Sequence, residues 1–301
     1  MRLRHIEIFE AIRQAGSLTQ AATLLNISQP AASKILAHAE AQLGFKLFER
    51  VKGRLVPTRE ADILAPQVAR LNQDLASIKR LAANLRQGKH GHLRIGCAPA
   101  IGLGLLPLTI QSFHKQKSTA TFEISTLHSA ELIAGLRAHE LDLIITFDTT
   151  EHPGVTRKVI GQTELAHLSC NSATAPVHLD HLPPRDLIVL DARDQVGALL
   201  ETALASSNVQ INAQIVVQTY YVACGLVEAG CGDAIVDMLT GRAMLKPGMV
   251  LRRLTPTVPI PICIMTHAND PQSMLHHDFV KRLTDSCQSL EMPASENSLR
   301  L

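Results

Sequence analysis

The chain has 301 residues, of which 46% are apolar, and this length suffices for two or three domains. The net charge of +2 conceals an uneven distribution: residues 1–90 hold 14 Lys and Arg against 7 Asp and Glu, whereas the remainder holds 15 against 20. A basic N-terminal part on an acidic body indicates a polyanion-binding surface near the N-terminus. No apolar run is long enough for a signal peptide or a membrane span, and the six cysteines are scattered, so we expect a cytoplasmic protein with reduced thiols and no membrane partner.

Three helices are predicted before residue 44. Apolar residues recur at three-residue steps from Leu3 to Ile12, with charges between them, which predicts one amphipathic helix. A short Ser-capped helix over Leu18–Leu25 follows, and a third Ser-capped helix, with Pro in its first turn, ends near Leu43. A short helix, a tight turn and a longer helix together predict a helix-turn-helix unit.

The segment after the third helix predicts a wing, because residues 45–57 contain two short apolar-rich strands around a turn with three basic side chains. On the outer face of the third helix, Gln29 can form a bidentate pair with adenine, and Ser33 can donate or accept a hydrogen bond. Lys34 can reach guanine or phosphate. We therefore expect contacts to double-stranded promoter DNA from Ser28, Gln29, Pro30, Ser33, Lys34, Arg50, Lys52 and Arg54. The alternative is a small helical domain with a solvated basic face, but the order of the features favours DNA binding.

The same segment carries a run of specific motifs: Phe9, Ala15-Gly16-Ser17-Leu18-Thr19-Gln20-Ala21-Ala22, Ser28-Gln29-Pro30-Ala31-Ala32-Ser33-Lys34, Leu43-Gly44, Leu47-Phe48-Glu49-Arg50 and Pro57-Thr58. With these motifs, residues 3–58 resemble the N-terminal domain of the LysR-type transcriptional regulators. The resemblance implies a homotetramer, a dimer of dimers, that binds a promoter and changes its grip when a small metabolite binds. The whole sequence resembles most the amino-acid-sensing branch of the family, which includes its founding lysine-biosynthesis regulator.

A long linker helix is predicted over residues 59–90, after a winged helix-turn-helix domain at 1–58. Its apolar residues alternate at steps of four and three, as in a heptad seam: Leu64, Val68, Leu71, Leu75, Ile78, Ala82 and Leu85. A seam between two domains favours packing on a partner chain, and the family resemblance implies dimerisation here. Pro66 inside this helix removes one backbone hydrogen bond and should kink it or cost about 3 kcal/mol.

Residues 91–301 alternate between strand and helix patterns, which predicts an α/β fold with parallel strand pairing. The predicted strands are 92–97, 121–127, 141–147, 164–170, 187–190, 214–218 and 233–237, and the helices are 103–115, 129–139, one from 196 and one from 220. Two lobes resembling periplasmic binding proteins are expected, with lobe I at about 91–160 and 267–290 and lobe II at about 161–266. The tail after about residue 290 is polar and is expected to be disordered.

Ligands of such folds bind where strands end and helices begin. We therefore expect an effector cleft lined by Ala98, Pro99, Ala100, Ile101, His128, Ser129, Thr146, Phe147, Gln195, Val196, Tyr220 and Asp237. For three of these residues an alternative stays open: Ser129 as a helix cap, His128 as a solvated loop residue and Tyr220 as core. A carboxylate at the strand end, Asp237, would suit a cation, which leads to the hypothesis of an effector with both ammonium and carboxylate groups.

Two alternatives remain open at this stage. A redox sensor on the same scaffold would use Cys224 and Cys231, which lie two helical turns apart, although no basic residue nearby would lower a thiol pKa. An enzyme or solute-binding domain fused to a DNA-binding head is disfavoured, because phosphate-loop, metalloprotease and nucleophile-elbow motifs are absent. We expect no catalytic residue, no cofactor and no metal site; the run at residues 276–278 suits a solvated helix start better than a metal cluster.

Overall fold

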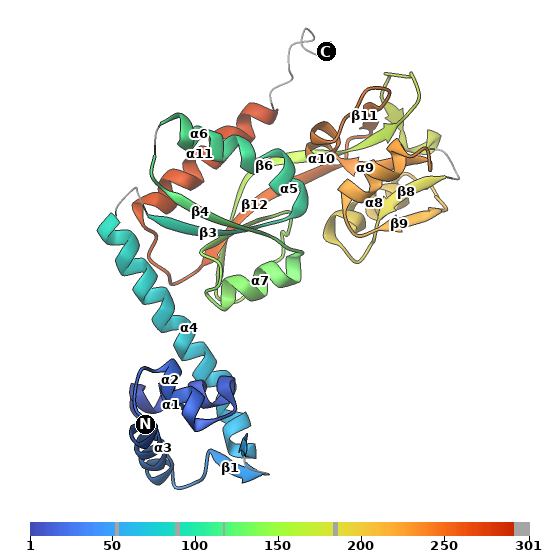
Figure 1. Cartoon of the computed structure of the whole chain (residues 1–301). Helices are drawn as coiled ribbons and strands as arrows, with labels where there is room; N and C mark the ends of the chain where they lie inside the picture. Colours follow the sequence, from blue (N-terminus) through green and yellow to red (C-terminus); the bar gives the residue numbers. More distant parts are fainter. Residues whose placement is uncertain (52–53, 88–90, 117, 183–185, 292–301) are drawn as a thin grey trace. The chain divides into compact units, whose positions relative to one another are not determined.

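The computed structural model describes residues 1–51, 54–87, 91–116, 118–182 and 186–291 (Figure 1). The chain divides into two compact units, Met1–Lys79 and Arg80–Leu301. The predicted tail from residue 292 onward lies outside the described residues. No described helix combines the length and the apolar character needed to cross a membrane.

The first unit contains the predicted helix-turn-helix and wing. Its elements are α1 (Leu3–Ala15), α2 (Leu18–Leu24), α3 (Gln29–Leu43), β1 (Phe48–Val51) and β2 (Arg54–Pro57). The Oγ atoms of Ser17 and Ser28 cap α2 and α3 by accepting from backbone N–H groups three residues later. The two helix-ending glycines, Gly16 and Gly44, have φ of 67° and 80°, the left-handed conformation that stops a helix.

Helix α4 (Arg59–Gln87) begins at the cap Thr58, whose Oγ1 accepts from the N–H of Ala61. The helix continues through Pro66, which is exposed to solvent. The start of the predicted seam needs correction, because Val68 is 7% exposed and packs into the core of the first unit. Further along, Leu71, Ile78 and Leu85 are 40%, 62% and 65% exposed and are left without apolar cover in the single chain.

The second unit holds two α/β lobes. Lobe I is built on the strand order β4-β3-β5-β12-β6, with β3, β4 and β5 parallel to one another. Its elements are β3 (His92–Cys97), α5 (Pro99–Gly104), α6 (Leu106–Lys115), β4 (Thr121–Thr126), α7 (Ser129–Arg137), β5 (Leu143–Thr146) and α11 (Met274–Glu291). Helices α6 and α11 cover one face of this sheet, and α7 covers the other (Figure 1).

Lobe II continues the sheet as β6-β10-β8-β9, with β8, β9 and β10 parallel. Its elements are β7 (Val177–His178), β8 (Leu187–Leu190), α8 (Gln195–Ser206), β9 (Ile215–Val217), α9 (Tyr220–Glu228), β10 (Asp233–Asp237), α10 (Met238–Ala243) and β11 (Val250–Thr255). A short 3₁₀ turn, Leu179–His181, follows β7.

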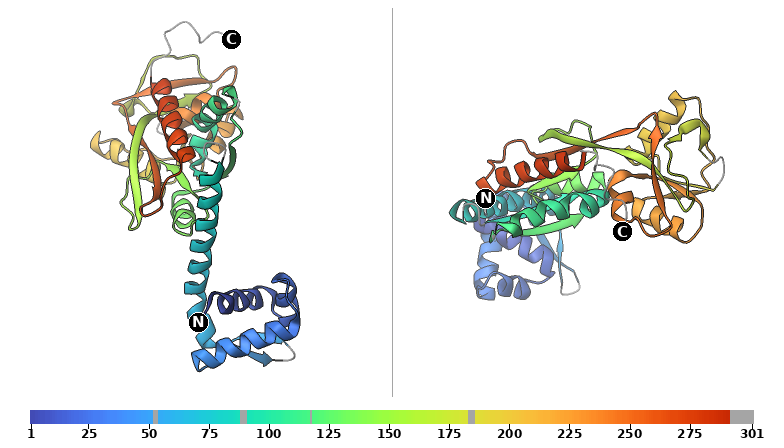
Figure 2. Two further views of the ribbon diagram at one scale, coloured as in Figure 1. Left: turned by 90° about the vertical axis from the view of Figure 1, so that its left-hand side faces the viewer. Right: turned by 90° about the horizontal axis from the view of Figure 1, so that it is seen from above.

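Two long antiparallel strands, β6 (Val155–Ser169) and β12 (Pro259–His267), run together between the lobes (Figures 1 and 2). The first part of β6 pairs with β12 in lobe I, and its last part pairs with β10 and β11 in lobe II. The predicted assignment of residues up to 266 to lobe II is wrong for the end of that range. Met265 and Cys263 pair with β5, so this part of β12 completes the sheet of lobe I.

Several predicted elements change in extent. The helix predicted from Leu103 begins at Pro99 and is divided into α5 and α6, because Leu105 interrupts the run. The strand predicted at 164–170 is the second half of the much longer β6. The sequence patterns missed α10, β11 and β12 and placed only a helix start, at residues 276–278, within α11; yet α11 and β12 supply Phe279 and Ile262 to the main core.

Candidate functional site

The exposed face of α3 presents the predicted polar side chains. Gln29, Ser33 and Lys34 are all exposed, and Lys34 forms no ion pair with a described residue. Ser28 uses its Oγ to cap the helix, accepting from Ala31 N at 3.4 Å, and Pro30 lies in the first turn, where no donor is lost. A free cation and amide beside a helix N-terminus form a surface suited to DNA.

The wing is the β1–β2 hairpin, in which Val51 pairs with Arg54. Arg50 and Arg54 are exposed and form no ion pair with a described residue. The third predicted basic residue, Lys52, lies outside the described residues. The wing therefore contributes at least two unneutralised guanidinium groups, which suit phosphate or minor-groove contacts.

A buried carboxylate that the sequence analysis missed joins the third helix to the wing. Glu40 is 7% exposed, and its Oε1 accepts from the backbone N–H groups of Leu47, at 2.9 Å, and Phe48, at 3.3 Å. Its other oxygen accepts from Lys46 Nζ at 2.7 Å. These bonds fix the start of the wing relative to α3, because each backbone donor is buried and has no water to replace its acceptor.

The second unit contains a cavity of about 710 Å³ at the ends of the parallel strands of both lobes. His128 and Ser129 follow β4, Asp148 follows β5, and Gln195 and Gln218 follow β8 and β9. The lining also includes Ala130, Ile133, Arg137, His152, Asp191, Arg193 and Asp194. This is the position at which open α/β sheets bind ligands. Of the predicted effector residues, the cavity brings together His128, Ser129 and Gln195.

Asp148 holds the lobe I side of the cavity through several hydrogen bonds. The predicted effector residues stopped one position earlier, at Phe147. Asp148 Oδ2 lies 2.9 Å from His152 Nε2, and Asp148 Oδ1 accepts from the N–H of Thr150 at 2.6 Å. Burial alone would raise the pKa of Asp148, but hydrogen bonds from Gln195, His152 and Thr150 outweigh it and hold the pKa below its ordinary value. The group is therefore a fixed carboxylate at neutral pH.

Gln195 spans the two lobes. Its Nε2 donates to Thr150 Oγ1 at 3.2 Å, while the residue itself starts α8 in lobe II. Its Oε1 is buried and accepts no hydrogen bond from the described residues. The side chain of Gln195 therefore bridges the cleft, and its Oε1 atom is available to accept a hydrogen bond from a ligand. These two features suit a residue that responds to closure of the lobes.

The lobe II rim of the cavity carries two more carboxylates. Asp194 caps α8 through a 2.9 Å bond from Val196 N to its Oδ1. Asp191 accepts from the guanidinium of Arg193, and these hydrogen bonds lower the pKa of Asp191 to about 2. Arg137 from α7 faces the same cavity and pairs with no carboxylate of the described chain. The cavity thus combines fixed negative charge with an available cation.

The loop at residues 98–101, which was predicted to line the effector cleft, offers few free backbone N–H groups. The N–H of Ala98 bonds Ile145 O, the N–H of Ile101 bonds Ala98 O, and Pro99 has none, so the N–H of Ala100 is the one that remains. None of the four predicted residues of this loop lines the cavity at the strand ends, which corrects their assignment to the effector cleft. Ser129 is also not the cap of α7: His128 occupies the cap position, and its N–H donates to the Glu131 carboxylate.

Other predicted effector residues lie beneath the cavity surface. Four of them, Thr146, Phe147, Val196 and Tyr220, are buried at 1%, 8%, 2% and 7% exposure. Asp237 is fully buried and caps α10, accepting from Thr240 N at 2.8 Å, while its Oδ2 has no partner in the described chain. Burial raises the pKa of Asp237 to about 6. The structure gives this residue a helix-capping role instead of a place on the cavity wall.

The cysteines do not suit peroxide sensing. Cys224 is buried in α9, and burial raises the pKa of its thiol to about 12, whereas a reactive cysteine needs a lowered pKa. Cys231 is exposed beyond the end of α9. This geometry disfavours the redox alternative for Cys224 and Cys231.

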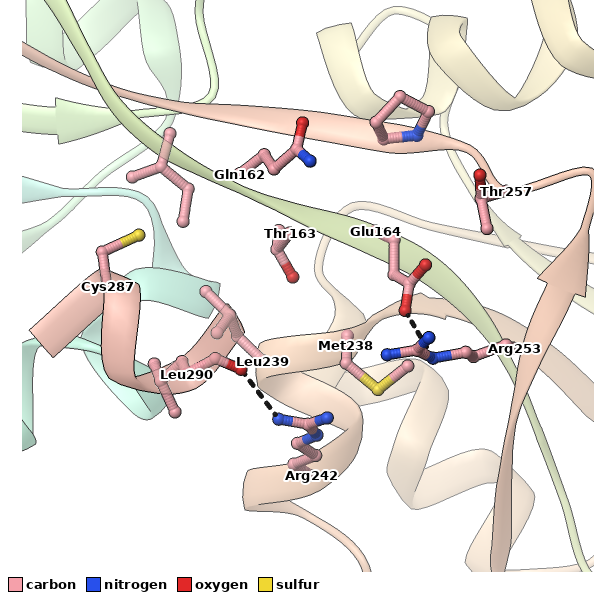
Figure 3. A pocket seen from close by; sticks show the side chains of 12 residues that line it. Gln162, Thr163, Glu164, Met238, Leu239, Arg242, Arg253, Thr257, Cys287 and Leu290 are labelled. Atoms are coloured by element: carbon pink, nitrogen blue, oxygen red, sulfur yellow. Dashed lines mark hydrogen bonds and ion pairs between the residues drawn. The ribbon is translucent and has the colours of Figure 1, made fainter. Parts of the chain in front are cut away.

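A second cavity, of about 410 Å³, lies against the crossing strands β6 and β12 and is bordered by α10 and α11 (Figure 3). Arg253 Nε pairs with Glu164 Oε1 at 3.0 Å, and Arg242 donates to Leu290 O at 3.5 Å. None of the predicted effector residues lines it, although Met238 and Leu239 in its wall directly follow β10. We therefore assign the candidate effector site to the first cavity.

A winged helix-turn-helix followed by a long helix and a two-lobed domain with a polar cleft defines a ligand-responsive DNA-binding regulator. Comparison with known families agrees: the model described as "Bacterial regulatory helix-turn-helix protein, lysR family" matches residues 3–62, and that of the "LysR substrate binding domain" matches residues 86–288. The chain belongs to the LysR family of transcriptional regulators. The predicted fold class and the predicted regulatory function are thereby confirmed.

Among curated relatives, the transcriptional regulator DgcR of Pseudoalteromonas sp is 38% identical over 85% of this chain and 89% of its own length. AdmX of Serratia plymuthica is 33% identical, covering 100% of this chain and 96% of its own. The transcriptional activator protein LysR of Escherichia coli (strain K12) is 34% identical, covering 93% and 91%. These relatives are named as regulators, not enzymes, which agrees with the prediction of a non-enzymatic protein.

Solved structures share the fold. A full-length OxyR variant from Pseudomonas aeruginosa matches with a TM-score of 0.67 at 20% identity, over 96% of this chain and 95% of that one. Full-length CbnR complexed with its target DNA matches with a TM-score of 0.66 at 22% identity, over 95% and 100%. At such identities the likeness concerns the arrangement of elements alone.

Proposed function

We propose that this regulator contacts promoter DNA through the predicted face of α3 and through the wing. The exposed Gln29 suits an adenine edge, and the unpaired cations Lys34, Arg50 and Arg54 suit phosphates. A Gln29→Ala variant should lose about 1–3 kcal/mol at one preferred base pair and relax specificity there, whereas Arg50→Ala should weaken all sequences alike and reduce the salt dependence. Unchanged sequence preference in the first variant would contradict this assignment.

We further propose that the cavity at the strand ends binds an amino-acid-like effector. One observation carries this proposal: the cavity is lined both by the carboxylates of Asp148 and Asp194 and by the guanidinium of Arg137. A ligand with an ammonium and a carboxylate group satisfies both signs of charge, whereas a simple anion or cation leaves one of them unmatched. This arrangement replaces Asp237 as the partner of the ammonium group.

The name of one relative supports the proposed ligand class. The "Octopine catabolism/uptake operon regulatory protein" OccR of Rhizobium meliloti is 27% identical over 84% of this chain. Octopine is an amino-acid derivative with both cationic and carboxylate groups. The proposed ligand class for this chain has the same two features.

Thermal shifts of the full chain test the effector class. Each free amino acid is compared with its decarboxylated amine and its N-acetyl derivative, and the best ligand should lose most of its shift in both derivatives. Asp194→Asn keeps the α8 cap, because Asn is an equally good cap, but removes the charge and should weaken binding about tenfold or more. Asp180→Asn, an exposed residue outside the cavity, is the matched control. A best ligand without an amino group, or equal affinity in Asp194→Asn, would overturn the proposal.

We propose that the chain acts as a homo-oligomer, a dimer of dimers. The exposed residues Leu71, Ile78 and Leu85 on α4 follow the heptad spacing and suit a helix–helix interface. A second apolar surface on lobe I, between α6 and the edge strand β4, includes Ile110 and Ile124, the latter 45% exposed. Two separate apolar surfaces on one chain are what a dimer of dimers requires. Analytical ultracentrifugation of the full chain, with expected species of two and four copies, tests this proposal.

A further inference from the structure

Two imidazoles and a carboxylate that do not line the effector cavity meet in lobe I. His139 follows α7, His267 ends β12, and Asp270 lies in the turn before α11. In the described part of the chain this is the one group of three possible metal ligands whose donor atoms all lie within 4.8 Å of one another. The residues are up to 131 positions apart, so the fold and not the local sequence brings them together.

The donor atoms of the cluster lie close enough together to share one metal ion. His139 Nδ1 lies 3.0 Å from Asp270 Oδ2, and His267 Nδ1 lies 3.5 Å from Asp270 Oδ1. The donor atoms of a tetrahedral zinc site with bonds of about 2.0–2.1 Å are about 3.3 Å apart. The two rings lie with centroids 4.4 Å apart and an angle of 35° between their planes, so both turn the same nitrogen toward one carboxylate.

The backbone holds the three groups from independent elements. His139 has φ of 53°, and its N–H bonds Leu136 O, so the residue occupies the left-handed position that ends α7, where Gly or Asn is usual. The N–H of Ala268 bonds Gly154 O, which fixes the turn that carries Asp270. The ligands are therefore positioned before any ion arrives, which lowers the cost of binding.

The nitrogen of His267 also points to a ligand. Its Nδ1 is buried and forms no hydrogen bond with the described residues, and Asp270 Oδ1 lies 3.5 Å from it. The side chains of His139 and His267 are 11% and 22% exposed, whereas that of Asp270 is 42% exposed. An ion can therefore enter over the carboxylate, and water can complete its coordination.

We propose that His139, His267 and Asp270 form a binding site for a divalent transition-metal ion of the zinc class. Two nitrogen ligands and one oxygen ligand suit Zn²⁺ or Co²⁺ better than Mg²⁺ or Ca²⁺, which prefer oxygen. The nearby guanidinium of Arg94 pairs with Asp142 at 3.0 Å, so its charge is balanced and does not oppose the ion. A bound ion joins the end of α7 to the turn before α11 and stabilises lobe I, because the unfolded chain cannot assemble the ligands.

Cobalt titration of the tag-free, chelator-treated full chain tests the site. One equivalent of Co²⁺ should produce the visible d–d bands of a low-symmetry nitrogen and oxygen site, and one equivalent of Zn²⁺ should remove them. Three variants should each weaken binding at least tenfold: His267→Gln, Asp270→Asn and His139→Asn, the last of which retains a residue suited to the left-handed backbone. His114→Gln, which removes an exposed histidine from α6, should bind as the unaltered chain does.

Thermal unfolding gives a second readout that does not depend on the variants being equally stable. Zn²⁺ should raise the unfolding temperature of the unaltered chain and of His114→Gln, but not that of Asp270→Asn, whose side chain is on the surface. Intense thiolate-to-cobalt charge-transfer bands would place the ion on Cys170 or Cys231, which are exposed, and would overturn the proposal. Equal loss of binding in His114→Gln, or no binding by the unaltered chain, would also overturn it.

Discussion

Replacing Asp237 by Asn should stabilise lobe II at neutral pH and weaken its pH dependence. Asp237 is fully buried, so its ionised form is disfavoured, and burial raises its pKa from 3.8 to about 6. A group with a raised pKa binds its proton more tightly in the folded state. Its contribution to stability is therefore greatest below the unfolded pKa and is lost as the pH rises through the folded pKa.

The size of the effect follows from the shift. About two pKa units correspond to about 3 kcal/mol between the extremes, of which about 1.4 kcal/mol is lost between about pH 5 and about pH 8. Asn retains the cap on α10, because its amide oxygen accepts from Thr240 N as the carboxylate does. Its NH₂ group replaces the unpaired Oδ2 and needs an acceptor, which offsets about 1–2 kcal/mol of the gain.

Tyrosine fluorescence isolates this effect. The chain has no Trp and two Tyr, and both, Tyr220 and Tyr221, begin α9 in lobe II. Urea unfolding of the full chain followed by this signal should show Asp237→Asn gaining about 1.4 kcal/mol relative to the unaltered chain when the pH is raised from about 5 to about 8. Asp180→Asn should show no such gain. An equal difference between the two proteins at both pH values would refute the assignment of a burial-raised pKa.

Three further predictions concern other parts of the chain. Glu40→Ala leaves the two buried N–H groups at the start of the wing without their acceptor and should destabilise the first unit by about 2–3 kcal/mol. Hydrogen exchange in α3 should become at least tenfold faster, and unaltered exchange would contradict the role of this carboxylate. Gln195→Ala removes the bond to Thr150 across the cleft and should weaken effector affinity about fivefold, as measured by calorimetry, while leaving DNA affinity without effector within about twofold. Ile78→Glu places a charge on the exposed seam and should raise the dimer dissociation constant at least tenfold in sedimentation, and an unshifted constant would exclude this seam from the interface.

The first unit was predictable because its signals are local. Three-residue apolar spacing and Ser caps each act within one turn of a helix, and both appear where predicted. Glu40 was not predictable in the same way, because on a helical wheel it is an ordinary polar residue. The donors that make it structural lie seven and eight positions later, on a different element.

The cleft was predictable in position but not in detail. Strand ends located His128, Ser129 and Gln195, yet extending the strand to Phe147 concealed Asp148, because β5 ends at Thr146. Asp237 was given the wrong role, since α10 had not been recognised and a strand-end carboxylate without a following helix has nothing to cap. The metal-ligand cluster could not be predicted, because no local pattern relates residues so far apart in the chain.

The paired strands β6 and β12 determine how the lobes can move. Their hydrogen-bonded ladder continues from Pro259 and Glu164 to His267 and Val155, with an irregularity between Ile262 and Cys263. A ladder of this kind resists bending in its plane, since that would stretch one edge, but it twists readily, and a bulge increases local twist. We therefore expect a ligand that contacts both lobes to change the twist of this two-stranded connection. Effector binding would then change the angle between the outer surfaces of the two lobes. A homo-oligomer would carry one such change in each of its copies.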